Sequence, residues 1–341
     1  MNKKPFLKII QNANEEGCRI VAPLLGFPGL NMTDCTIKLA QQNFNEHFKA
    51  MKAIADTFSP DIIFPLMDLS VEANALGCYT IFPRKQSPTV VNEHLGSKEF
   101  DWLDRINIAF DTRLIGYLET VKLMSISLPE SIMLGAYVAG PYSLAALMIG
   151  AEKAAMATVM NQDYLTQICQ MATERIQTYV RLLIVAGAQV ICILEPSAVM
   201  LGPDQFEQYS AKYVRYISNS CKYTGVATMY HVCGNTMHLF KKMSQAKVDA
   251  ISLDSREAGV DLPAVASQVS SEVAIVGNIN PTGSILNGSP DDVSSEVLSL
   301  LENMAPYPNF ILSTGCDLPQ ETPLENIKAF MEVGRSYRLK K

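Results

Sequence analysis

Residues 226–254, VATMYHVCGNTMHLFKKMSQAKVDAISLD, contain two apolar runs with a short polar stretch between them. The first run, Val226–Tyr230, leads directly into the polar residues HVCGNT, and the second run, Ala250–Leu253, ends at Asp254. The residues between the runs have the composition of a short helix. A strand, a helix and a second strand in close succession form the unit from which parallel sheets are built. This stretch therefore predicts an α/β fold.

The same alternation of apolar runs and helical segments extends in both directions along the chain. Eight such runs are found in all, and eight strand–helix units favour a closed barrel over an open sheet. No G-x-G-x-x-G motif follows the first run, which opposes a dinucleotide-binding fold. We therefore predict a (β/α)8 TIM barrel. The six further runs are Arg19–Leu24, Asp61–Phe64, Ile132–Tyr137, Val190–Leu194, Val273–Val276 and Phe310–Ser313.

The chain of 341 residues has the length of one such barrel, so we predict a single domain over residues 1–341. The sequence GCYTIFPRKQSPTVV (77–91) interrupts the pattern and predicts a hairpin insertion after the second strand, over about 70–108. Thr36–Thr57 is expected to be helical, and Tyr142–Ala186 is long enough for two helices.

The composition is typical of a folded enzyme. Hydrophobic residues make up 48% and charged residues 18%, which excludes a disordered chain. The net charge of −6 gives no indication of a nucleic-acid or membrane partner. No apolar run of membrane-spanning length and no apolar signal core are found, so we expect a cytoplasmic protein. Its eight cysteines are then expected to be reduced.

Polar side chains follow the predicted strands at the point where each strand ends. In a (β/α)8 barrel this end carries the active site. Asp68, Glu195 and Asn278 follow the second, fourth and seventh strands and are predicted to bind substrate. His231 and Cys233 follow the fifth strand. Turn formation and helix capping are the alternative roles for such residues.

The histidine, its neighbouring cysteine and a late cysteine predict a metal site. His231 and Cys233 are two residues apart, so both side chains face the same side of an extended strand. Cys316 follows the eighth strand and projects from the same rim. Two thiolates and one imidazole suit tetrahedral zinc with a fourth position open. A disulfide between the two cysteines and a hydrogen-bonded core histidine are the alternatives.

The charge of this ligand set indicates the chemistry, with His231, Cys233 and Cys316 as the predicted catalytic residues. Zinc with two thiolates is formally neutral. A substrate thiol that enters the fourth position loses its proton, and the sulfur stays nucleophilic in an anionic complex. A site of three neutral histidines stays cationic and is better suited to activating water. The pattern therefore favours thiol alkylation over hydrolysis.

Four stretches carry a family resemblance: DLSVEANALGC, HVCGNT, GNINP and STGCDLPQETPLEN. They resemble the methylcobalamin:coenzyme M methyltransferase-like branch of the uroporphyrinogen decarboxylase superfamily, and the likeness covers essentially the whole chain. It implies a TIM barrel with zinc on His231, Cys233 and Cys316. It also implies methylcobalamin or another methyl-corrinoid as the methyl donor, presented by a separate corrinoid protein. In this branch an acidic residue at the end of the next strand can approach the zinc when substrate is absent. The resemblance assigns this position to Asp254, which is shorter than the glutamate expected there.

The resemblance implies a small thiol as methyl acceptor, with coenzyme M as the first choice. Its sulfonate needs a positive partner, for which Arg84 and Lys85 are candidates. Homocysteine and tetrahydrofolate are alternative acceptors. A uroporphyrinogen decarboxylase is a further alternative, but its carboxylate-rich substrate is bound by N-terminal arginines, and APLLGFPGLNMTDC (22–35) contains none. A barrel that only binds zinc or a corrinoid protein is the non-catalytic alternative.

Overall fold

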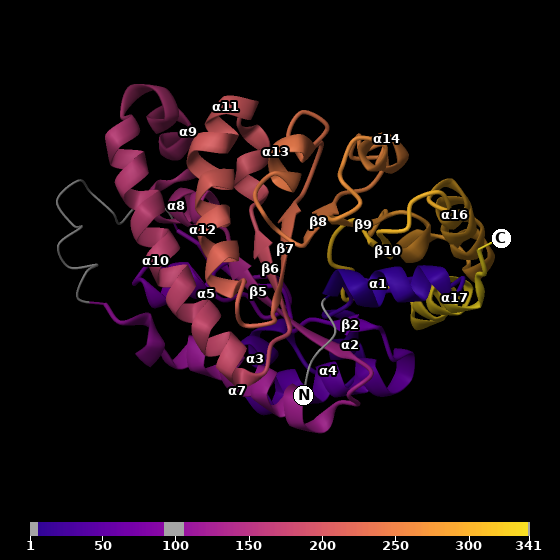
Figure 1. The fold of residues 1–341 in the computed structure, drawn as a ribbon. Coiled ribbons are helices and arrows are strands. Elements are labelled where there is room, and N and C mark those ends of the chain that lie inside the picture. The colour runs from indigo at the N-terminus through magenta and orange to yellow at the C-terminus, as the bar shows by residue number, and fades with distance from the viewer. Residues whose placement is uncertain (1–5, 92–105, 340–341) are drawn as a thin grey trace.

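The computed structural model describes residues 6–91 and 106–339 (Figure 1). Its main sheet has eight parallel strands in the order β1-β10-β9-β8-β7-β6-β5-β2, with helices between successive strands. The predicted (β/α)8 TIM barrel is confirmed. The strands are β1 (Ile20–Val21), β2 (Ile62–Ile63), β5 (Met133–Ala139), β6 (Val190–Leu194), β7 (Ala227–Val232), β8 (Ala250–Leu253), β9 (Ala274–Ile279) and β10 (Phe310–Thr314).

Asp61 joins the two ends of this sheet. Its backbone N–H donates to the carbonyl of Val21 at 3.0 Å, and its Oδ2 accepts the N–H of Val21 at 2.6 Å. The carboxylate thus takes the place of a backbone carbonyl between β1 and β2. All eight predicted strands are present, and β6 and β8 have the predicted bounds.

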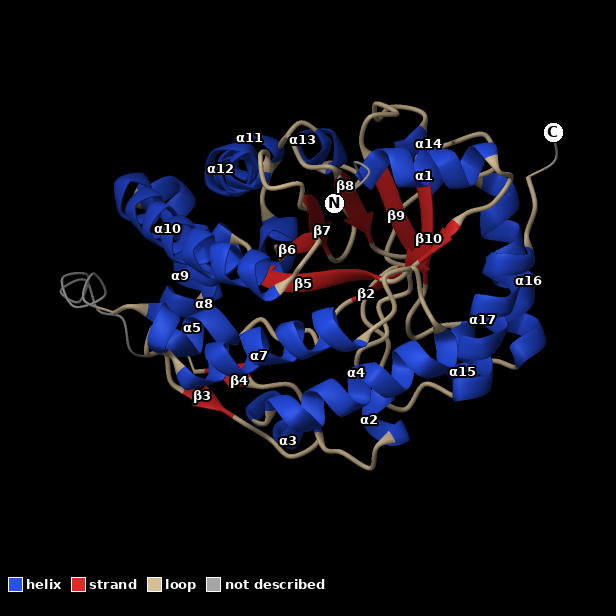
Figure 2. Cartoon of the chain, turned by 60° about the horizontal axis from the view of Figure 1, so that its bottom comes forward, coloured by secondary structure: helices blue, strands red, loops and turns tan. Residues whose placement is uncertain are grey.

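Helices surround the strands on the outside (Figure 2). A 3-10 turn covers Ile108–Phe110, another (η2) covers Pro196–Met200, and a π-helical turn covers Glu207–Ala211. The α-helices are α1 (Phe6–Glu15), α2 (Pro28–Met32), α3 (Ile37–Gln42), α4 (Phe44–Phe58), α5 (Val71–Ala75), α7 (Thr112–Ser127), α8 (Pro141–Ile149), α9 (Ala151–Met160), α10 (Gln162–Ala186), α11 (Pro203–Phe206), α12 (Lys212–Cys221), α13 (Phe240–Ser244), α14 (Leu262–Ala266), α15 (Ser284–Asn287), α16 (Pro290–Asn303) and α17 (Leu324–Ser336).

The helical prediction for Thr36–Thr57 is confirmed, and the prediction of two helices over Tyr142–Ala186 needs correction. The stretch Thr36–Thr57 holds two helices, because the side chain of Asn43 caps α4 by accepting the N–H groups of Asn45 and Glu46. The stretch Tyr142–Ala186 holds three helices rather than two. Within the described residues, no single helix is long and apolar enough to cross a membrane; α8 and α9 meet that test only together, with a bend of 109° between them.

The segment predicted as an insertion contains a short hairpin. Strands β3 (Thr80–Ile81) and β4 (Thr89–Val90) pair antiparallel, with Thr80 opposite Val90. Residues 92–105 of the predicted insertion (about 70–108) lie outside the described residues.

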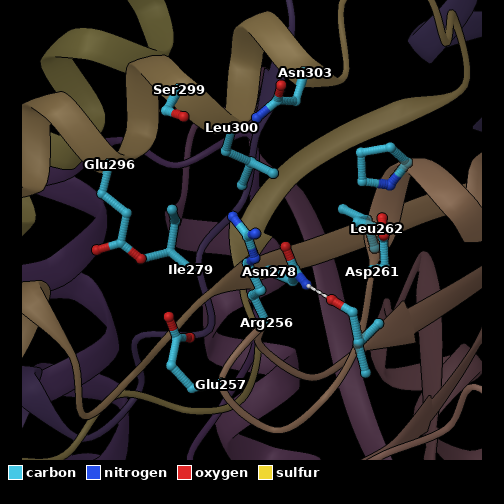
Figure 3. Close-up of a pocket in the computed structure, with 12 residues that line it drawn as sticks. Arg256, Glu257, Asp261, Leu262, Asn278, Ile279, Glu296, Ser299, Leu300 and Asn303 are labelled. Carbon is cyan, nitrogen blue, oxygen red and sulfur yellow. Dashed lines mark hydrogen bonds between the residues drawn. The ribbon is translucent and has the colours of Figure 1, made fainter.

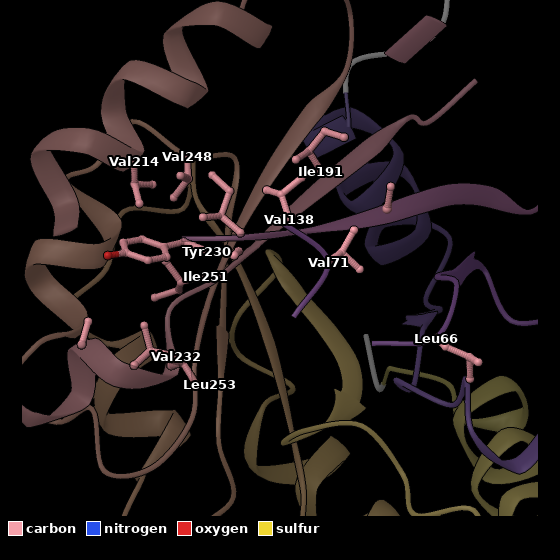
Figure 4. Packing of buried hydrophobic residues seen from close by; sticks show 14 of the residues in the cluster. Leu66, Val71, Val138, Ile191, Val214, Tyr230, Val232, Val248, Ile251 and Leu253 are labelled. Carbon is pink, nitrogen blue, oxygen red and sulfur yellow. The ribbon is translucent and has the colours of Figure 1, made fainter. Parts of the chain in front are cut away.

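Alternation along the strands separates two apolar layers. In β6, Val190, Cys192 and Leu194 face the barrel interior, while Ile191 and Ile193 pack against the helices. Figure 4 shows part of the outer layer, including Tyr230, Val232, Ile251 and Leu253 on β7 and β8. Helix α1 packs on the inner residues at the starts of the strands. The interior is therefore closed at that end, and polar side chains are found at the other.

Candidate metal centre

Strand β7 brings His231 to the inner face of the barrel. Ala227 and Met229 face the interior, and His231 continues the same alternation. Its side chain is buried, and its Nε2 lies 3.1 Å from Sγ of Cys233. The predicted convergence of these two side chains is thus observed.

Cys316 reaches the same point from β10. Gly315 packs so closely on the backbone N of Ser255 that a Cβ would lie 2.6 Å from it, which brings the β10 loop over the end of β8. Sγ of Cys316 then lies 3.6 Å from Sγ of Cys233. The ligand atoms of His231, Cys233 and Cys316 all lie within 4.8 Å of one another. We refer to these three residues as the Cys2His cluster.

The geometry of the Cys2His cluster fits zinc. Zn–S bonds of about 2.3 Å in a tetrahedron place two sulfur atoms roughly 3.8 Å apart, close to the observed 3.6 Å. A disulfide requires about 2.05 Å, and all eight cysteines are free. Cys233 and Cys316 are partly exposed residues, whereas His231 is fully buried. A small molecule can therefore approach from the cysteine side.

Ser252 orients the imidazole. It lies opposite His231 in the register of β7 and β8, and its Oγ is 3.0 Å from Nδ1. An Nδ1–H that donates to this hydroxyl leaves Nε2 as the metal-binding nitrogen. Sequence reasoning missed Ser252, because a serine within a strand carries no motif; the register with His231 was the available signal.

The Cys316 thiol is held in its protonated form. Its pKa lies well above the usual value, first because of the hydrogen bond with the Cys233 thiol and then because of burial, while the nearby His231 acts in the opposite direction. A metal ion that binds here must displace this proton.

Asp254, predicted as a further ligand, is not brought into the Cys2His cluster. Its Oδ2 accepts the N–H of Gly234 at 2.7 Å, and its Oδ1 accepts the N–H of Ser255 at 2.6 Å. The carboxylate is thus bound to the backbone beside Cys233.

Asp68 lies in a buried ion pair. Its carboxylate contacts the guanidinium of Arg113 and accepts hydrogen bonds from the hydroxyls of Ser70 and Tyr117. The guanidinium also lies 4.7 Å from the ring centroid of Phe82. These contacts tie α5 and α7 to the end of β2, a structural role that the sequence did not reveal.

Glu195 directly follows β6 and is fully buried. Its side chain reaches the start of α8. Its carboxylate accepts four hydrogen bonds, from the backbone N–H groups of Tyr142 and Ser143 and from the hydroxyls of Ser143 and Ser210. Burial raises the pKa of Glu195 to about 7, and these hydrogen bonds act against that shift. With both oxygens occupied by the protein, we propose no substrate contact for this residue.

Asn278 lines a cavity of about 470 Å³ beside the ends of β8 and β9 (Figure 3). Its Nδ2 donates to the carbonyl of Asp254 at 2.9 Å and also approaches the carbonyl of Val260. Charged side chains of Arg256 and Glu296 line the same cavity. Asn278 therefore supports the loop after β8, whose Asp254 accepts the N–H of Gly234 beside Cys233.

Two further polar side chains lie near the Cys2His cluster. Tyr137 faces the barrel interior from β5 and stacks on Phe64 with 4.8 Å between ring centroids. Asp317, the residue after Cys316, has a buried Oδ2 without a hydrogen-bond partner in the described part of the chain. Burial raises the pKa of Asp317 to about 7. Only the fold reveals that these groups are close to the site.

The sequence of this barrel matches a known protein family. The sequence matches the family described as Uroporphyrinogen decarboxylase (URO-D) over residues 32–337. The chain belongs to the uroporphyrinogen decarboxylase family. The match covers every strand of the barrel from β2 to β10 and all three residues of the Cys2His cluster.

Relatives within this family carry two different activities. A methylcobamide:CoM methyltransferase of Methanosarcina mazei is 29% identical over 80% of this chain and 78% of its own length. A uroporphyrinogen decarboxylase of Prochlorococcus marinus is 23% identical over 82% of this chain and 79% of its own. A solved methyltransferase structure from Methanosarcina mazei superposes with a TM-score of 0.82 at 22% identity, covering 96% of this chain and 98% of that one. The predicted likeness to the methyltransferase branch is confirmed, and with it the prediction that the chain is an enzyme.

Proposed function

We propose that this enzyme transfers a methyl group from a methylated corrinoid to a small thiol activated at a zinc ion. The observation that carries the proposal is the Cys2His cluster at the carboxyl end of the barrel strands, with two thiols 3.6 Å apart and an imidazole beside them. The methylcobamide:CoM methyltransferases among its relatives support the corrinoid as donor and coenzyme M as acceptor.

His231, Cys233 and Cys316 would hold the zinc, and Ser252 would keep the imidazole in the required tautomer. When bound, zinc supplies a Lewis acid that lowers the pKa of a coordinated thiol. The two cysteine thiolates offset the charge of the metal, so a third sulfur remains a strong nucleophile. The partly exposed cysteines leave room for that thiol, while the buried imidazole side is closed.

The overall reaction balances without a further reactant. The sulfur lone pair of the thiolate forms the new C–S bond to the methyl carbon. The Co–C bond breaks, and its electron pair stays on cobalt, which gives cob(I)alamin and a thioether. The thiol proton is released when the acceptor binds. We propose that a separate corrinoid protein presents the methyl group to the open end of the barrel.

The decarboxylase alternative is less well supported. Uroporphyrinogen decarboxylases are also among the relatives, at 23% to 26% identity, so family membership alone does not choose between the activities. The choice depends on the site, where residues 22–35 provide no arginine for a carboxylate-rich substrate and two thiols converge with an imidazole.

Acceptor choice can be tested with the zinc-loaded full chain. Methylcobalamin is mixed with coenzyme M, homocysteine or tetrahydrofolate, and loss of the methyl-corrinoid absorbance is followed together with product mass. We expect methylation of coenzyme M and little of the other two. Transfer only to homocysteine or tetrahydrofolate would change the acceptor, whereas no transfer with any of them and decarboxylation of uroporphyrinogen would overturn the proposal.

A further inference from the structure

Asp254 lies between the two loops that carry the clustered cysteines. On one side, its Oδ2 accepts the N–H of Gly234, the residue directly after Cys233. On the other side, Gly315 packs on the backbone of Asp254 and Ser255, where a Cβ would lie 3.0 Å from the carbonyl carbon of Asp254. One short segment at the end of β8 therefore contacts the neighbours of both cysteines.

Every oxygen of Asp254 already has a donor in the protein. Its Oδ1 accepts the N–H of Ser255 at 2.6 Å, its Oδ2 that of Gly234 at 2.7 Å, and its backbone carbonyl accepts the side-chain amide of Asn278 at 2.9 Å. A carboxylate that moved from this position toward a metal would leave two partly buried backbone N–H groups without their partner, and unmade hydrogen bonds at such groups cost free energy.

As placed, the Asp254 carboxylate is also not part of the group of ligand atoms that lie within 4.8 Å of one another. A carboxylate oxygen that lay within 4.8 Å of all three ligand atoms would belong to the same group, and that of Asp254 does not. Asp has one methylene fewer than Glu, so its carboxylate cannot reach farther without moving the backbone that Asn278 holds.

We propose that Asp254 is a positioning residue that clamps the two cysteine loops and does not ligate the metal, an inference that rests on the proposed zinc site. The fourth coordination position is then open to water or to the acceptor thiol before substrate binds. Thiol binding displaces no protein ligand. Asn278 acts through the same clamp, by holding the carbonyl of Asp254.

Zinc affinity with and without thiol distinguishes a clamp from a ligand. Zinc binding to wild type and Asp254→Ala is measured by competition with a chromophoric chelator, in buffer and in saturating coenzyme M. Loss of a clamp weakens zinc binding by about 10–100-fold under both conditions. If Asp254 were instead a ligand that the thiol displaces, Asp254→Ala would weaken zinc binding only in the absence of thiol. The variant would then also bind the thiol more tightly than wild type, and this result would overturn the inference.

Asp261→Ala serves as the matched control. Asp261 also accepts a backbone N–H, from Ala264 at 3.0 Å, but it caps α14 outside the cluster. We expect the zinc affinity of the Asp261→Ala variant to equal that of wild type. If this variant lost as much zinc affinity as Asp254→Ala, the loss would be a general effect of removing a capping carboxylate, and the inference would be overturned.

A crystal structure of the zinc-loaded wild type provides a readout that does not depend on a variant folding. We expect the carboxylate oxygens of Asp254 to lie more than about 3 Å from zinc, while a bond of about 2.0–2.2 Å would overturn the inference. If the proposed function itself were wrong, the wild-type protein would bind no zinc, a result that differs from a zinc ion ligated by Asp254.

Discussion

Ser252 shows how a residue outside the Cys2His cluster sets its properties. Its hydroxyl is fully buried and lies 3.0 Å from Nδ1 of His231. We expect Ser252→Ala to lower zinc affinity by about 10–100-fold, because the imidazole loses the partner that fixes its tautomer and orientation. Chelator competition measures the change.

Ser313→Ala is the control for this prediction. Ser313 is equally buried, but its hydroxyl donates to the carbonyl of Ala22 and does not contact His231. Zinc affinity should stay at the wild-type value in this variant. An equal loss in both variants would mean that the effect arises from removing any buried serine hydroxyl.

The buried carboxyl of Glu72 should make the free energy of unfolding depend on pH. Burial raises the pKa of its carboxyl from the ordinary 4.5 to about 7 in the folded protein. The folded state therefore binds more protons than the unfolded state in this window, so the contribution of Glu72 is most favourable below pH 4.5 and is lost as pH rises toward 7. The loss is roughly 3 kcal/mol in the free energy of unfolding.

Glu72→Gln should remove this dependence. The variant keeps an oxygen that can accept the N–H of Ala139, so the fold is retained. We expect the stability of the variant relative to wild type to increase from pH 5 to pH 8 in urea titrations. The exposed Glu302→Gln on α16 should follow the wild-type profile, and a parallel profile for Glu72→Gln would refute the prediction.

At the residue scale, the sequence predicted where a side chain points in those cases in which the spacing along a strand alone determines it. His231 and Cys233 face one side of a strand in any register, and Cys316 was recognised by its place after the last strand. The partners of buried carboxylates were not predictable, since Glu195 and its donors Ser143 and Ser210 meet only through the fold. The same is true of Asp68 and Arg113.

At the scale of elements, Gly135 allows β5 to pack in the barrel interior. A Cβ at this position would lie 2.2 Å from Cε1 of Phe64, whose ring stacks on Tyr137. We expect Gly135→Ala to destabilise the protein by about 1–3 kcal/mol through overpacking. The midpoint of urea unfolding measures this change.

Gly116→Ala provides the opposite case. Gly116 lies within α7, and a Cβ there meets nothing within 4 Å. Alanine favours the helix by about 0.5–1 kcal/mol, so the unfolding midpoint should rise. Equal shifts of the same sign in both variants would contradict the packing described for β5.

Strands were predicted more accurately than helices. Each strand is a compact apolar run, so β6 and β8 have their predicted bounds. Helix breaks depend on local hydrogen bonds, such as the side-chain cap of Asn43 between α3 and α4, which composition does not show. The break between α8 and α9 occurs at Gly150, with φ at 94°.

At the scale of the whole molecule, a metal on the Cys2His cluster joins strands that are not neighbours. Between β7 and β10 the sheet contains β8 and β9. Zinc that binds only the folded barrel should therefore raise the thermal midpoint as its concentration increases, and a chelator should reverse the change. The rise should be larger at pH 8 than at pH 6, because the raised pKa of Cys316 makes protons compete with the metal. A midpoint insensitive to zinc at both pH values would contradict this account.

The architecture and the family were predictable because they depend on patterns that extend along the whole chain. Eight alternating units indicated the barrel, and the motifs around His231 and Cys316 indicated the methyltransferase branch. Closure of the sheet by the side chain of Asp61 was not predictable, since it depends on the distance between β1 and β2. That the 341 residues form one domain and that the protein is cytoplasmic stay predictions.

The most direct test of the account is the zinc content of purified protein, measured by mass spectrometry for wild type, His231→Ala, Cys316→Ala and Cys18→Ala. Cys18 is a partly exposed free cysteine near the end of α1 and serves as the control. We expect about one zinc per chain in wild type and Cys18→Ala, and below about a tenth of that in the two cluster variants. Full zinc in His231→Ala and Cys316→Ala, or none in wild type, would contradict the claim that this cluster holds the metal.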